Sequence, residues 1–114
     1  MAAVRIVPAD GDAEFPYAEA LVLLQAMRGA VQERADIASV IAAGKRVGWP
    51  QALIDVHLEF MKNGKCFDFT TDAGISCTLW EDNIFFRFRS ADHEAQCMPI
   101  IEDLAVRLSC RVMR

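Results

Sequence analysis

Residues 54 to 90 carry the pattern that most constrains this chain, because short runs of alternating apolar and polar residues are separated there by turn-forming segments. Turns are expected at Asn63-Gly64, at Asp72-Ala73-Gly74 and at Asp82-Asn83. Asn-Gly suits the two positive φ angles of a type I′ turn, whose twist matches that of the strands it joins. The segment therefore predicts a four-stranded antiparallel β-meander.

The three turns also predict which residues face each other in this meander. Apart from Val56 opposite Thr71, the pairs join apolar residues, so one face of the predicted sheet is apolar and needs a cover. The expected pairs on this face are Phe60–Phe67, Leu58–Phe69, Phe69–Cys77, Phe67–Leu79, Leu79–Phe86 and Cys77–Phe88.

Before the meander, the chain predicts a short strand and two helices. The strand is expected at 4–7, and the first helix is expected to carry Pro16 in its first turn and an apolar stripe that reaches Val31. The second helix is expected to begin at Asp36 and to end near Gly44, since glycine commonly ends helices.

After the meander, a helix capped by Ser90 or Asp92 is expected to run to about Ser109 and to cover the apolar face. Pro99 interrupts it, and a helix that begins there after a preceding turn costs less than a kinked one. A last strand is expected at 110–114. The apolar stripe of the helix consists of Ile101, Leu104, Ala105 and Leu108.

The fold class predicted from these elements is α+β, as a single domain spanning residues 1–114, because neither half of the chain would have an adequate core alone. The net charge is −4 without a cluster of Lys or Arg, which argues against nucleic acid as a partner. The N-terminal segment lacks the apolar core of a secretory signal, and no apolar run is long enough for a membrane span.

The four cysteines have neither a C-x-x-C spacing nor a paired histidine. They are therefore expected to be reduced thiols in the cytoplasm, with no metal site among them. No phosphate-binding glycine loop, nucleotide fingerprint or cofactor-attachment motif is present, so no cofactor is expected.

The second face of the predicted sheet is mixed, and it is the candidate functional surface. Trp80 beside Phe85 on a face with charged rows is typical of a recognition surface. The same residues would be buried if the N-terminal helices packed over that end of the sheet. The expected rows are Met61, Cys66, Trp80 and Phe85; Glu59, Asp68, Thr78 and Arg87; and His57, Thr70, Ser76 and Arg89.

Catalytic interpretations of this face are weaker. His57 and Ser76 are expected two strands apart, about 10 Å on ordinary strand spacing, which is beyond hydrogen-bond reach. Glu59 directly opposite Asp68 could raise the pKa of one carboxyl, but screened pairs of like charge also occur on open surfaces.

We therefore expect a small cytosolic protein-interaction module that binds a protein partner through the mixed face. Small acidic α+β domains of this kind include immunity proteins, which neutralise basic toxin domains, and an inhibitor of that class is one expected form. The alternatives are a homodimeric structural protein and a small-molecule-binding or enzymatic domain that uses the row of His57, Thr70 and Arg89. The residues expected to bind the partner are Trp80, Phe85, Met61, Glu59, Asp68, Arg87, His57 and Arg89.

Overall fold

The computed structural model describes residues 4–34 and 36–114, apart from the side chain of Phe60. It confirms the α+β class, with a C-terminal helix followed by a closing strand. In chain order, its elements are β1 (Val4–Pro8), α1 (Tyr17–Gln25), β2 (Val31–Arg34), α2 (Ile37–Arg46), α3 (Gln51–Lys62), β3 (Phe67–Thr70), β4 (Ser76–Leu79), β5 (Ile84–Phe86), α4 (Ala91–Arg107) and β6 (Cys110–Met113).

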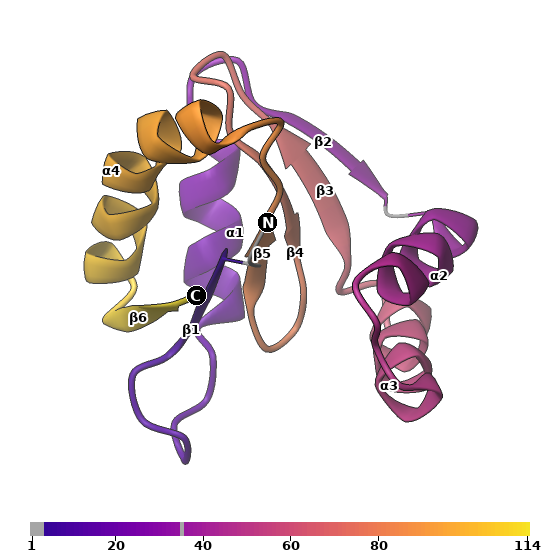
Figure 1. Cartoon of the computed structure of the whole chain (residues 1–114). Helices are drawn as coiled ribbons and strands as arrows, with labels where there is room; N and C mark the ends of the chain where they lie inside the picture. The colour runs from indigo at the N-terminus through magenta and orange to yellow at the C-terminus, as the bar shows by residue number, and fades with distance from the viewer. Residues whose placement is uncertain (1–3, 35) are drawn as a thin grey trace.

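The described strands form one sheet in the order β2-β3-β4-β5-β1-β6, and all neighbouring strands are antiparallel. Two of the six, β1 and β6, come from opposite ends of the chain and pair with each other. Figure 1 shows α1 and α4 together on one side of the sheet, while α2 and α3 lie apart from them. The two helix pairs therefore have separate packing partners.

The apolar face of the sheet forms the main core with α1 and α4. The expected pairs Phe67–Leu79 and Phe69–Cys77 are confirmed. The stripe expected on the C-terminal helix is buried against this face, as are apolar residues of β1 and α1. The fully buried side chains include Val4, Ile6, Leu24, Phe69, Cys77, Leu79, Ile84 and Ile101.

The pairing of β4 with β5 differs from the prediction by two residues. Leu79 faces Ile84 rather than Phe86, and Cys77 faces Phe86 rather than Phe88. The turn lies one position earlier than expected, because the Trp80 N–H donates to the Asn83 carbonyl across 2.8 Å. A shift of two residues keeps the same face, since side chains alternate with a period of two. The predicted apolar face is therefore correct, although the register of β5 is not.

The predicted first strand of the meander is wrong, because residues 51–62 form the helix α3. Ile54 and His57 are buried, at 2% and 6% exposure, while Val56 is 45% exposed. This burial follows the spacing of a helix face and not the alternation of a strand. The expected pairs of Leu58 and Phe60 with β3 do not form, and the Phe60 side chain lies outside the described part of the structure.

Asn63-Gly64 ends α3 instead of forming a hairpin turn. Gly64 has a φ of 72°, and its N–H donates to the Met61 carbonyl across 3.0 Å. A left-handed glycine just after the last turn is a common helix end. The place of the predicted strand beside β3 is taken by β2, which pairs Val31–Arg34 with Phe67–Thr70. The meander itself therefore has the three strands β3, β4 and β5.

The helix boundaries contain three further corrections. The first helix ends at Gln25, and Gly44 lies inside α2, which continues to Arg46. The expected start of the last helix at Pro99 is wrong, because α4 begins after Ser90 and runs through the proline. The Ser90 hydroxyl accepts the His93 N–H at 3.1 Å, and acidic residues follow in the first turn, so the N-terminal half is stabilised on its own.

Candidate binding groove

A small second core joins α2 and α3 to the mixed face of the sheet. Val40 of α2 is buried with Cys66 and Trp80, and Met61 and Phe85 pack against them. α2 forms here because Asp36 caps it, accepting the Ser39 N–H and hydroxyl at 3.0 Å each. This core places α2 above the sheet and so forms one wall of the candidate site.

His57 lies between two indole rings in this second core. It stacks on Trp49 with ring centroids 4.4 Å apart, and it meets Trp80 edge-on at 4.4 Å. Its Nδ1 lies 2.7 Å from the Leu53 carbonyl, one turn earlier in α3. Trp49 in turn meets Phe85 edge-on at 6.4 Å. His57 therefore acts as an aromatic packing residue that fixes α3 to the sheet.

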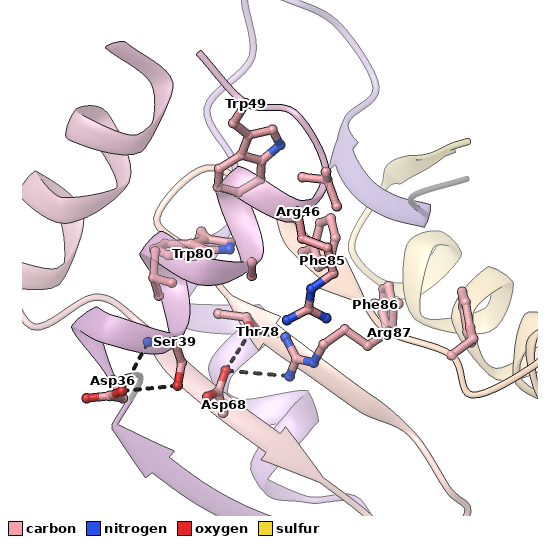
Figure 2. A pocket seen from close by; sticks show the side chains of 14 residues that line it. Asp36, Ser39, Arg46, Trp49, Asp68, Thr78, Trp80, Phe85, Phe86 and Arg87 are labelled. Carbon is pink, nitrogen blue, oxygen red and sulfur yellow. Dashed lines mark hydrogen bonds and ion pairs between the residues drawn. The ribbon is translucent and has the colours of Figure 1, made fainter. Parts of the chain in front are cut away.

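An open groove of about 580 Å³ lies between α2 and the mixed face (Figure 2). Its size falls within the usual range of ligand sites, about 300 to 1,000 Å³. Apolar side chains and charged side chains both line it. The lining residues are Asp36, Ser39, Val40, Ala43, Arg46, Val47, Trp49, Asp68, Thr78, Trp80, Phe85, Phe86, Arg87 and Phe88.

Three polar residues of the sheet form a connected network on the floor of the groove. The Thr78 hydroxyl donates to Asp68 Oδ1 and accepts from Arg87 Nη1, at 2.5 Å each. Arg87 Nη2 lies 3.5 Å from the same Asp68 oxygen. The network holds the Arg87 guanidinium in one position on the groove floor.

Arg46 enters the groove from the opposite wall, at the end of α2. It makes no hydrogen bond or ion pair with any residue that the structure describes. Figure 2 shows its guanidinium and that of Arg87 pointing toward each other across the groove. Arg46 was not among the expected site residues, because a basic residue near an expected helix end has a sufficient role in stabilising that end.

The structure brings together four of the residues expected to bind a partner. Trp80, Phe85, Asp68 and Arg87 all line the groove. Trp80 is only 4% exposed, so helices do cover this end of the mixed face, although they are α2 and α3 and not α1. The accessible part of the expected surface is therefore the groove beside Trp80 rather than the indole itself.

The other expected residues lie elsewhere. Met61 packs under the groove from α3. Glu59 is on the exposed side of α3 and accepts the Lys62 ammonium at 2.9 Å, so the expected opposition to Asp68 is wrong. The helix moves residue 59 off the sheet altogether. Arg89 is exposed just before α4 and does not line the groove.

The row of His57, Thr70 and Arg89 does not form, because these residues lie on α3, on β3 and ahead of α4. His57 and Ser76, which were expected two strands apart in one sheet, lie on α3 and on β4. A buried histidine does occur at His93, whose Nε2 lies 2.8 Å from the Gly74 carbonyl and whose Nδ1 accepts the Arg89 N–H at 3.0 Å. The Nε2 contact thus ties α4 to the β3–β4 turn, while the Nδ1 contact is local to the start of the helix.

The four cysteines are all free thiols. Burial is the largest cause that raises the pKa of Cys66 and of Cys77, to about 12 each. Such thiols are neutral and unreactive at physiological pH. Among the described residues, no group of three or more potential ligands could hold a metal ion, and no helix is long and apolar enough to cross a membrane.

No protein-family model, curated protein or solved structure matches this chain.

Proposed function

We propose that this chain is a small protein-interaction module, and that the groove between α2 and strands β3 to β5 binds a segment of a partner protein. The observation that supports this most is the groove itself. It combines an aromatic wall from Trp49 and Phe85 with fixed charges at Asp68 and Arg87. Apolar contacts supply affinity in such sites, while a few placed polar groups fix orientation.

The position of the groove also favours a partner segment. One wall is the helix α2 and the floor is the sheet, so an extended chain or a short helix can lie along α2 (Figure 2). The Trp49, His57 and Trp80 rings fix α2 and α3 to the sheet, which keeps the walls in place before binding. A preformed site loses less conformational entropy when it is filled.

We also propose that the module works in a reducing compartment such as the cytoplasm. All four cysteines are free, and Cys66 lies in the second core that supports the groove. An inhibitor or immunity-type protein remains one form that such a module could take, and the groove would then contact the inhibited protein.

The proposal is tested by selecting binders from a random peptide library displayed on phage, with the wild-type chain as bait. Ala43→Trp fills the groove, because Ala43 lines it from α2. Ala42→Trp is the matched control, since Ala42 is the exposed neighbour on the same helix and does not line the groove. We expect selected peptides to lose at least about tenfold in affinity on Ala43→Trp and to keep their affinity on Ala42→Trp.

Peptides that bind both variants equally, or a selection that yields no binder, would contradict the proposal. Sedimentation velocity over a range of concentrations tests the homodimer alternative. A dimer that Ala43→Trp dissociates would show that a second copy of the chain occupies the groove instead of a different partner.

A further inference from the structure

Two arginines line the groove, and within the described part of the chain only one of them is paired with a carboxylate. Arg87 is paired with Asp68 and hydrogen-bonded to Thr78. Arg46 has no charged partner among the described residues, although its guanidinium points at that of Arg87 (Figure 2). A guanidinium has five N–H donors, so Arg87 keeps donors for a ligand after its two contacts with the sheet.

The other carboxylate of the groove lies too far along α2 to neutralise Arg46. Asp36 and Arg46 are ten residues apart at opposite ends of the helix, which corresponds to about 15 Å at 1.5 Å per residue. That separation exceeds the Debye length of about 8 Å at physiological ionic strength. Asp36 is also engaged by the N–H and hydroxyl of Ser39. The Arg46 end of the groove therefore carries an excess of one positive charge.

A role in stabilising the end of α2 does not explain why the Arg46 side chain points into the groove. Basic residues in a last helical turn interact favourably with the helix dipole, and Lys45 is placed equally well for that. Of the two, only Arg46 lines the groove. Its guanidinium points toward that of Arg87 there (Figure 2), an arrangement that an anion bound between them would stabilise.

Resting on the function proposed above, we propose that the partner segment carries an aspartate or glutamate whose carboxylate binds between Arg46 and Arg87. A carboxylate has one negative charge, which matches the one uncompensated guanidinium. A phosphate would bring nearly two charges close to Asp68 in a chain of net charge −4. Arginine forks bind carboxylates in two-point geometry, which also sets the orientation of the segment.

The same geometry indicates the neighbour of the acidic residue. Trp49 and Phe85 lie beside the two arginines on the wall and floor of the groove (Figure 2). A residue adjacent to the acid would contact these rings, and an apolar side chain there removes apolar surface from water. The segment is therefore an acidic residue flanked by an apolar one.

The test uses the peptides selected on the wild-type chain. Each Asp or Glu in a selected peptide is replaced by Asn or Gln, and the affinities are measured by fluorescence polarisation. We expect one acidic position per peptide whose replacement weakens binding to the wild-type chain by about tenfold. When the protein carries Arg46→Gln, replacing that acidic residue of the peptide should change the affinity by less than about twofold, since the arginine that the acid pairs with is gone.

Lys45→Gln is the matched control, because it removes a neighbouring exposed charge that does not line the groove. It should keep the full tenfold difference, and far-UV circular dichroism checks that each variant is folded. The small-molecule probe is N-acetyl-leucine, which has a carboxylate and an apolar side chain but no further peptide residues. It should bind far more weakly than the peptides.

The outcomes separate this inference from the function on which it rests. Some peptides could lose affinity on Ala43→Trp, and so depend on the groove, yet contain no acidic residue coupled to Arg46. That result would overturn the inference and leave the proposed interaction module intact. A selection without groove-dependent peptides would overturn both. Binding of N-acetyl-leucine as tight as that of the peptides would replace the partner segment with a small carboxylic acid.

Discussion

Gly44 offers a test of how α2 and α3 are packed, because two effects of a Gly44→Ala substitution oppose each other. Alanine is favoured over glycine inside a helix by about 1 kcal/mol, and Gly44 lies inside α2. An added Cβ would however lie 2.9 Å from Trp49 Cε3 and 3.0 Å from Ile54 Cγ1. Neither neighbour can move freely, since Trp49 is stacked on His57 and Ile54 is 2% exposed.

We expect the contact to outweigh the helix preference. Overpacking a core costs about 1 to 3 kcal/mol, so the net change is a loss of about 1 kcal/mol in the free energy of unfolding, where propensity alone predicts a gain of the same size. Urea denaturation followed by far-UV circular dichroism measures it. Ala42→Gly, at an exposed position of the same helix that does not line the groove, reports the propensity effect alone and should cost about 1 kcal/mol.

A double variant connects the loss to its cause. In a Trp49→Leu background the nearest atom to the new Cβ is removed, so Gly44→Ala should cost less there than in the wild-type chain. A Gly44→Ala variant that is more stable than the wild type by about 1 kcal/mol would refute the close packing of the two helices at this point.

Two further predictions concern the end of α3 and the buried thiols. Gly64→Val should lower the free energy of unfolding by about 1 to 2 kcal/mol, because Gly64 has a φ of 72° that β-branched residues adopt poorly, and an unchanged urea midpoint would contradict this helix end. Cys66 and Cys77, with pKa values of about 12, should resist maleimide at pH 8 in the native state and react once the chain is unfolded, as mass spectrometry of labelled peptides can show. Since both folded pKa values lie above the ordinary value of 9.0, the unfolded state releases these protons first, so the stability that the neutral thiols provide is full below pH 9 and falls between pH 9 and 12.

The strands whose pairing is local were predictable, and the element that depends on distant contacts was not. β3 and β4 pair as expected because a short turn and apolar alternation specify the same register. β2 has four exposed residues and little alternation, so it is a strand only because β3 offers it a partner. Nothing in residues 31–34 by themselves indicates that pairing.

The error at α3 has a specific physical cause. Residues 54–60 alternate between apolar and polar types, while Ile54, His57 and Met61 share one face of a helix. His57 was counted as polar, whereas between two indole rings it fills an aromatic position. Asn63-Gly64 added to the error, because the same dipeptide ends a helix as readily as it turns a hairpin.

Only part of the candidate site was predictable from the sequence, because local patterns do not specify contacts between distant segments. Asp68 and Phe85 lie in β3 and β5, Trp80 and Arg87 directly follow β4 and β5, and the face assigned to all four was correct. Arg46 and Trp49 come from α2 and the segment after it, whose position above the sheet is set by contacts distant in sequence. A helix pattern specifies which side chains share a face, but not which other element that face meets.

The segment that contains α2 and α3 joins two strands that are neighbours in the sheet, since Arg34 at the end of β2 faces Phe67 at the start of β3. None of the described residues from 36 to 66 belongs to the main core. The main core and the helix that walls the groove therefore come from different parts of the sequence. Under the function proposed above, substitutions on the groove side of this segment would alter what the groove accepts without replacing any residue of the main core.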